Sequence, residues 1–239
     1  MIKSYKNITL IPKIEPLQKI SVIKGQNEIL GEVFLETKRQ IRNPNNITTF
    51  LKDKFDNIIG TEDLSYEKNS PNIVGLFIQV IPMLRQQNLG LGEILRLSSI
   101  IFMIENKIKE MEIFSKAEAV YFHSKYKFEP EIKSFDERNY ALKSIIKNCQ
   151  NEFEEIKLEA INIVKKVASD KSAENQRNLC KETNILLKEY IQEILARKDK
   201  YKSHSFDFGF RMILNTNDIL DNKIFFNNLF KKHKIDYEI

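Results

Sequence analysis

The stretch NIVGLFIQVIPMLRQQNLGLGEILRLSSIIFMIEN, residues 72–106, decides how the rest of the chain is interpreted. It opens with an apolar run, 73–81, that Pro82 ends. The run is rich in Val, Ile and Phe and is too short for a typical helix, so it predicts a buried strand. A polar turn and two glycines follow, and from Ile94 apolar residues recur at helical spacing. The stretch therefore predicts a strand, a glycine loop and a helix.

The loop before this helix is suited to bind an anion. The first amides of a helix lack intrahelical partners, and the helix dipole makes that end partly positive. Gly90 and Gly92 carry no side chain that would keep an anion away from the backbone. A phosphate or pyrophosphate is the natural ligand, although the same unit is also a common packing device in α/β proteins. The loop has neither the Walker Gly-Lys-Ser/Thr ending nor a full G-x-G-x-x-G.

Composition limits the class of protein. With 239 residues, the chain fits one domain with an addition, or two small domains. Hydrophobic residues make up 42% and charged residues 30%, which predicts a globular core. The net charge is +5 from 38 basic and 33 acidic residues that are scattered along the chain. We therefore do not expect a nucleic-acid partner.

Cysteine usage and the absence of long apolar runs bear on location. Cys149 and Cys180 lie in helical-looking sequence without a CxxC motif or a histidine cluster, which favours reduced cysteines and no zinc site. The sequence shows no apolar signal region and no run of membrane-spanning length. We expect a cytoplasmic protein without a membrane partner, and leave export without a cleavable signal as an alternative.

The first 71 residues predict strands and one helix. A first strand is expected over 2–11, and Pro12 and Pro16 bracket a turn. Strands over 19–24 and 29–36 form a hairpin around residues 25–27. Helical spacing over 47–59, ended by Gly60, predicts a helix, and the polar segment 61–71 predicts a loop or an edge.

The segment after the opening stretch predicts a return to the sheet. Residues 107–114 alternate as a strand, and because a helix precedes them, this strand should run parallel to 73–81. Ser115 is the expected N-cap of a short helix over 116–126. An extended segment over 128–134 follows.

The remaining residues predict a helical segment and a last strand. Residues 136–202 contain neither Pro nor Gly, and their apolar stripes predict two antiparallel helices that break at 169–172. We interpret them as a structural hairpin. Residues 206–214 predict a strand, and 217–233 predict a terminal helix capped near Asn217.

Residues 73–130 resemble the GNAT family of acetyl-CoA-dependent N-acetyltransferases. The first matching feature is V-x-P-x-x-R-x-x-N-x-G, beginning at Val80, and the second is the parallel strand over 109–114. The third is AVYFHSKYKFEP, residues 119–130, which is similar to the family's A-x-x-F-Y-x-x-x-G-F segment. A second register of the loop, Gln87-x-x-Gly90-x-Gly92, places the same amides at the helix start.

Four positions depart from the family pattern. Asn88 replaces the first loop glycine, which is mild because Asn tolerates the left-handed conformation. Lys116 stands where Asn is usual, and Lys127 replaces Gly. His123 replaces the tyrosine that commonly protonates the departing thiolate.

The resemblance implies an α+β fold in which helices flank a mixed central sheet. Residues 1–135 would form the core, 136–202 a helical hairpin inserted in it or added to it, and 203–239 a strand that completes the sheet and a terminal helix. Because the family ends in a β-hairpin, segments 128–134 and 206–214 would be its two arms.

The resemblance also implies direct transfer of an acetyl group from acetyl-CoA to an amine of a protein or small molecule. Loop amides would bind the pyrophosphate with Arg85, and the backbone of 79–81 would pair with the pantetheine and polarise the thioester carbonyl. His123, as an imidazolium, would be the general acid. The cofactor-binding residues expected are Gln79, Val80, Ile81, Arg85, Gln86, Gln87, Asn88, Leu89, Gly90, Leu91, Gly92 and Ser115.

Two other functions stay open at this point. One is a GNAT-like module that binds CoA or a protein through the helical hairpin, either as a homodimer or with a different partner. The other is an RNA-modifying acetyltransferase, against which the scattered charge argues. For the general base, Glu32, Glu36 and Glu112 lie on expected strands, and the sequence favours none of them.

Overall fold

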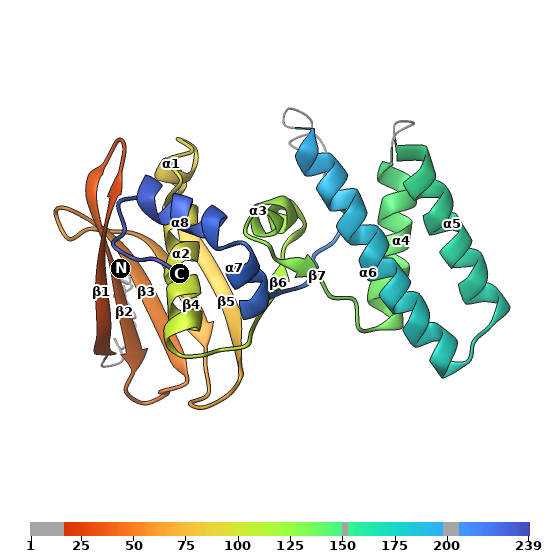
Figure 1. Cartoon of the computed structure of the whole chain (residues 1–239), viewed down its shortest axis with the longest axis horizontal. Helices are drawn as coiled ribbons and strands as arrows, with labels where there is room; N and C mark the ends of the chain where they lie inside the picture. The colour runs from red at the N-terminus through yellow and green to blue at the C-terminus, as the bar shows by residue number, and fades with distance from the viewer. Residues whose placement is uncertain (1–16, 150–152, 198–205) are drawn as a thin grey trace, which may run out of the picture.

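The computed structural model describes residues 17–149, 153–197 and 206–239, so the strand and turn expected within 2–16 lie outside the described residues. An eight-stranded sheet carries the fold, in the order β1-β2-β3-β4-β5-β6-β8-β7 (Figure 1). Its strands are β1 (Leu17–Asn27), β2 (Gly31–Gln40), β3 (Asn46–Asp53), β4 (Ile58–Ser65), β5 (Asn72–Val80), β6 (Glu110–Ser115), β7 (Glu129–Pro130) and β8 (Phe210–Asn215).

Among the described strands, β5 and β6 form a parallel pair and every other neighbouring pair is antiparallel. The connection between β5 and β6 runs through α1 (Pro82–Arg85) and α2 (Leu91–Glu105), which is the strand, loop and helix unit that the sequence predicts. The architecture is α+β with a mixed sheet flanked by helices, as predicted.

The core lies between α2 and the sheet. Inward-facing residues alternate along the strands, so Val33, Leu35, Ile47, Leu51 and Leu64 are almost completely buried. The intervening residues of β2 and β3 are more exposed and include the ion-paired Glu36, Lys38 and Lys52. After β8 the chain forms α7 (Thr216–Asp221) and α8 (Lys223–Lys232), which lie beside α2 (Figure 1).

Two predictions for the N-terminal half are wrong. The helix expected over 47–59 is β3 followed by the start of β4. The loop or edge expected over 61–71 begins with the rest of β4, an interior strand, and only residues 66–71 form a loop. Phe50 and Phe55 have helical spacing, but Phe55 is exposed in the turn between these strands. The first hairpin is confirmed, with its turn at 28–30 instead of 25–27. The Asn27 side chain sets that turn because its Oδ1 accepts hydrogen bonds from the amides of Ile29 and Leu30.

The helical segment contains three helices instead of two: α4 (Phe135–Asn148), α5 (Glu154–Ser169) and α6 (Ala173–Ala196). The break at 169–172 is confirmed, and the Ser172 side chain caps α6. β7 pairs with β8, so segments 128–134 and 206–214 meet as expected and the three helices are inserted between them. The terminal helix begins after Asn215 instead of near Asn217 and is interrupted at Asn222.

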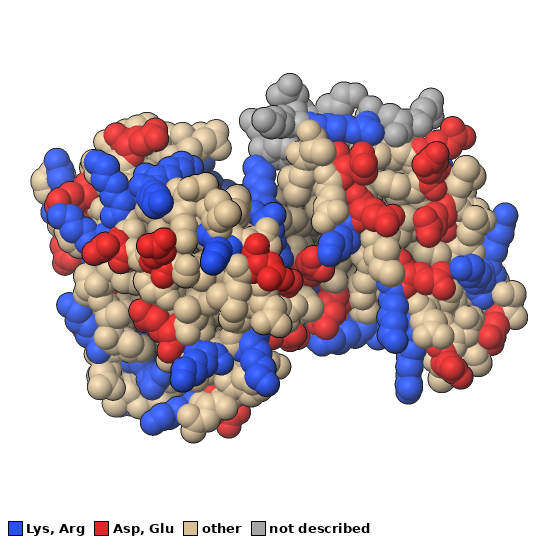
Figure 2. All heavy atoms as spheres, in the orientation of Figure 1, with Lys and Arg blue, Asp and Glu red and all other residues tan. Residues whose placement is uncertain are grey.

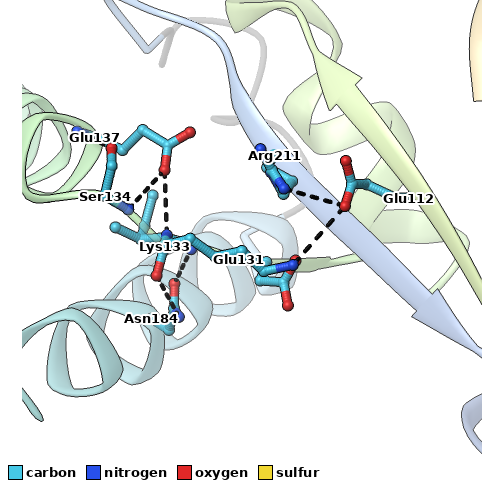
Figure 3. A network of polar contacts seen from close by, with 8 residues as sticks. Glu112, Glu131, Lys133, Ser134, Glu137, Asn184 and Arg211 are labelled. Carbon is cyan, nitrogen blue, oxygen red and sulfur yellow. Dashed lines mark hydrogen bonds and ion pairs between the residues drawn. The ribbon is translucent and has the colours of Figure 1, made fainter. Parts of the chain in front are cut away.

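Polar contacts fasten this three-helix arm to the sheet (Figure 3). Asn184 of α6 accepts a hydrogen bond from the Ile132 amide at 2.6 Å and donates one to the Ile132 carbonyl at 3.4 Å. Lys133 lies 2.7 Å from Glu131 and 3.8 Å from Glu112 of β6. The Phe206 ring also packs against three other rings: Tyr121 of α3 (Val120–Lys125), Tyr190 of α6 and Phe210 of β8. The arm is therefore anchored in the core.

Candidate active site

β5 and β6 separate in the middle of the sheet. Their parallel ladder runs from Asn72 opposite Glu110 to Gly75 opposite Ile113, although β5 continues to Val80. Just beyond Gly75, Leu76 is an extra residue in the pairing with β4, and such a bulge bends a strand. Gly75 is required there because a Cβ atom would lie 2.8 Å from Cγ2 of Ile113.

A cleft of about 570 Å³ opens where the two strands separate. β5 contributes residues 75–80 to its lining, and the loop before α2 together with the start of α2 contributes residues 88–92. α3 (Val120–Lys125) contributes Phe122 and His123, while Glu62 and Arg96 line it from the core. The strand β5, which the sequence predicts to be buried, is therefore partly exposed to the cleft at Leu76 and Phe77.

The loop has the conformation that its sequence predicts. Asn88 and Gly90 both adopt the left-handed region, with φ of 52° and 71°. Gly90 is the N-cap of α2, and no side chain caps this helix end. A helix of 15 residues therefore begins at the cleft, and its N-cap residue, a glycine, has no side chain to satisfy the first amides.

The structure brings most of the expected site residues together. Those that line the cleft are Gln79, Val80, Arg85, Asn88, Leu89, Gly90, Leu91, Gly92 and His123. Ile81, Gln86, Gln87 and Ser115 do not line it. Ser115 is also not an N-cap: it is buried at the end of β6, its hydroxyl donates to the Lys116 carbonyl, and a 3₁₀ turn, η1 (Ala117–Ala119), precedes α3.

The cleft also contains a buried charged cluster that the sequence did not predict. Nη1 of Arg96 lies 3.0 Å from Oε1 of Glu62, and these side chains are 2% and 1% exposed. Nη2 of Arg96 lies 3.4 Å from Nδ1 of His123, and the guanidinium stacks 4.8 Å from the Phe128 ring centroid. A signal was present, since Arg96 interrupts an apolar helix and Glu62 occupies an inward position of β4. Buried charges are costly unless they are paired.

The cluster changes the protonation of its members. Burial raises the pKa of Glu62 to about 7, although the charge of Arg96 opposes the shift. Burial, together with the positive charge of Arg96, lowers the pKa of His123 to about 2. The imidazolium expected from the sequence is therefore not the form present near neutral pH. Because a guanidinium only donates, Nδ1 of His123 accepts and the ring proton lies on Nε2.

The three carboxylates considered as bases from the sequence do not line the cleft. Glu32 pairs with Lys24, Glu36 pairs with Lys38 and Lys52, and Glu112 pairs with Arg211. Two carboxylates, Glu62 and Glu118, line the cleft together with His123, and of these two Glu62 is the one beside Arg96.

The surface carries charges of both signs. On the face shown in Figure 2, Lys and Arg residues alternate with Asp and Glu residues over both the sheet region and the three-helix arm. None of the helices in the described part of the chain is both long enough and apolar enough to span a bilayer.

Comparison with known proteins finds no matching family model and no matching curated protein. Solved structures do match. Tetrahymena GCN5 has 17% sequence identity and a TM-score of 0.34, over 38% of this chain and 55% of that one. A GNAT-family acetyltransferase from Staphylococcus aureus Mu50 has 23% identity and a TM-score of 0.34, over 40% of this chain and 60% of that one.

A spermidine/spermine N-acetyltransferase, SpeG from Vibrio cholerae, has 18% identity and a TM-score of 0.34, over 38% of this chain and 55% of that one. The matched part therefore spans little more than half the length of each of these three solved chains.

Proposed function

We propose that the protein is an N-acetyltransferase that transfers an acetyl group from acetyl-CoA to an amine of a protein or small molecule. The observation that supports this function is that one cleft contains both the gap between β5 and β6 and the left-handed loop at the start of α2. The ladder between β5 and β6 ends at Gly75, and the left-handed loop of Asn88 and Gly90 starts α2 beside the strand that continues.

Each feature suits a different part of acetyl-CoA. The amides at the start of α2 bind the pyrophosphate, and the Arg85 guanidinium adds a charge-assisted contact. The free edge of β5 over residues 76–80 pairs with the amides of the pantetheine arm, as an exposed strand edge does with an extended peptide. The thioester then lies between β5 and α3.

The reaction requires the amine to lose a proton and the thiolate to leave. The amine nitrogen forms a bond to the carbonyl carbon, the carbon–sulfur bond breaks, and the electron pair stays on sulfur. We assign Glu62 as the base that accepts the proton of the amine, since a base with a pKa near 7 is well matched to neutral pH. Because the Glu62 side chain is buried, the proton reaches it through a water molecule. Neutral His123 donates a hydrogen bond from Nε2 to the thiolate, which needs little help because a thiol has a pKa of about 8.5.

Calorimetric titration with acetyl-CoA tests the cofactor. We expect wild-type protein to bind and Gly90→Asp to lose binding, because the new carboxylate repels the pyrophosphate. Gly31→Asp is the matched control: Gly31 also has a positive φ, 76°, and lies in the β1–β2 hairpin away from the cleft. Absence of binding by the wild type would end the proposal.

A module that binds CoA or a protein without turnover is the second candidate. The three-helix arm favours it by exposing the apolar side chains of Tyr140, Leu158 and Ile185. A screen of amines and basic peptides that detects released thiol separates the two functions. Turnover with any acceptor supports the enzyme, whereas binding without thiol release by the whole screen supports the module.

A further inference from the structure

We propose that the end of α8, Lys232 and His233, holds the anion-binding loop in its binding shape and neutralises a carboxylate beside it. This inference rests on the proposed function, because the loop is the part assigned to the acetyl-CoA pyrophosphate. It gives the segment after β8 a positioning role in cofactor binding.

Glu93, in the first turn of α2, is where three elements meet. Its Oε1 accepts from Nε2 of His233 and from Nζ of Lys232, both at 2.6 Å. Its Oε2 accepts from the Tyr126 hydroxyl, just after α3, at 2.7 Å. The first turn of α2 is therefore tied to the ends of both α3 and α8.

The same end of α8 supports the loop from behind. A Cβ atom at Gly90 would lie 3.7 Å from Cε1 of His233, so the ring closes one side of the loop. The His233 carbonyl accepts from the Gln26 amide at 2.6 Å. The neighbouring Asn27 side chain donates to the Leu89 carbonyl at 2.6 Å. β1 is thus hydrogen-bonded both to the end of α8 and to the loop, and the other side of the loop faces the cleft.

The hydrogen bonds to Glu93 also compensate its negative charge beside the proposed anion site. A carboxylate three residues after the N-cap stabilises a helix but repels an anion bound at the same end. Burial raises the pKa of Glu93, but hydrogen bonds from His233, Lys232 and Tyr126 outweigh this and lower the pKa to about 2. Glu93 is therefore ionised, and the donors from α8 compensate its charge. Without them, a pyrophosphate would meet a less compensated carboxylate.

Three substitutions and one control test the role. Lys232→Met removes a donor from a side chain that is 51% exposed, so the fold tolerates it. His233→Phe removes the other donor and keeps a ring, whereas His233→Gln retains a side-chain donor. Lys231→Met is the control: it removes the same charge from a neighbouring exposed residue whose ammonium does not pair with Glu93.

The expected result is a rise of roughly tenfold in the Kd for acetyl-CoA in Lys232→Met and His233→Phe, which corresponds to one charge-assisted hydrogen bond. The KM for acetyl-CoA should rise equally, with kcat within twofold of wild type. His233→Gln should restore most of the affinity, and Lys231→Met should match wild type.

Wild-type affinity in both Lys232→Met and His233→Phe would overturn the inference and leave the proposed function intact. Equal losses in Lys231→Met, or no recovery in His233→Gln, would also overturn it. Failure of the wild type to bind acetyl-CoA would instead overturn the proposed function, so the two failures are distinguishable.

Discussion

The Arg96 guanidinium lies 3.0 Å from the Glu62 carboxylate, and both side chains are almost completely buried beneath α2. Removing either partner would leave the other charge buried and uncompensated, which typically costs 3–5 kcal/mol. The same guanidinium lies against the ring of His123. One buried cation thus influences the protonation of both residues to which we assign chemistry.

Glu62→Gln should remove the base while keeping the shape of the side chain. We expect kcat/KM of the wild type to rise with pH through about 7, because the carboxyl must be ionised to accept the proton. In the variant this rise should disappear and the rate at pH 8 should fall about 100-fold. Thiol release measured from pH 5.5 to 9 checks both.

The affinity for acetyl-CoA should be unchanged in Glu62→Gln, since Glu62 is assigned to the acceptor proton. Glu36→Gln is the control, because Glu36 lies outside the cleft. A variant that retains the rise through pH 7 would show that another group is the base.

His123→Asn should make the fold less sensitive to acid. The folded-state pKa of His123, about 2, lies below its unfolded value of about 6.5. Below pH 6.5 the unfolded chain therefore binds a proton that the folded chain does not, and the free energy of unfolding falls by up to about 1.4 kcal/mol per pH unit. Asn has no proton to bind, so its profile should be flatter between pH 6.5 and 4.5.

Urea unfolding at pH 4.5, 5.5, 6.5 and 7.5 measures both profiles. Glu62 acts in the opposite direction: its raised pKa favours the fold below about 4.5, and this contribution is lost as pH rises through about 7. Since Glu62 is present in both proteins, the comparison isolates His123. Parallel profiles would contradict the burial of a neutral ring.

Gly75→Ala should destabilise the protein by about 1–3 kcal/mol, because the new methyl group lies 2.8 Å from Cγ2 of Ile113. The cost should be smaller in an Ile113→Ala background, which removes that atom. A double-mutant cycle from urea unfolding measures the difference. Additive effects would mean that these two residues do not set the approach of β5 to β6.

Lys127→Gly should be more stable than Lys127→Ala by about 1 kcal/mol, because Lys127 has a φ of 68° just after α3, a region that glycine adopts without strain and alanine does not. Both variants lose the contact between Nζ and the Phe225 ring at 5.2 Å, so it cancels in the comparison. Thermal and urea unfolding check the order. Equal stability, or a more stable Ala variant, would contradict it.

The local pattern of the chain was sufficient for the centre of the fold. Residues 73–106 have an apolar run of strand length followed by helical spacing, and a crossover helix requires the next strand to be parallel, so β5, α2 and β6 follow from the sequence. The left-handed loop follows as well, because Asn and Gly tolerate that conformation. The sequence of residues 47–65 led to a wrong helix prediction because a few apolar side chains, among them the exposed turn residue Phe55, have helical spacing.

Only the tertiary structure decided the chemistry of the cleft. Glu62, Arg96 and His123 are far apart in the sequence, as are Glu93 and His233, and no local pattern connects them. The pKa values of Glu62, Glu93 and His123 depend on burial and on neighbours that only folding supplies. The sequence alone therefore indicated a place for an anion, and the packed core determined that His123 is neutral and that Glu62 is the carboxylate poised near pH 7.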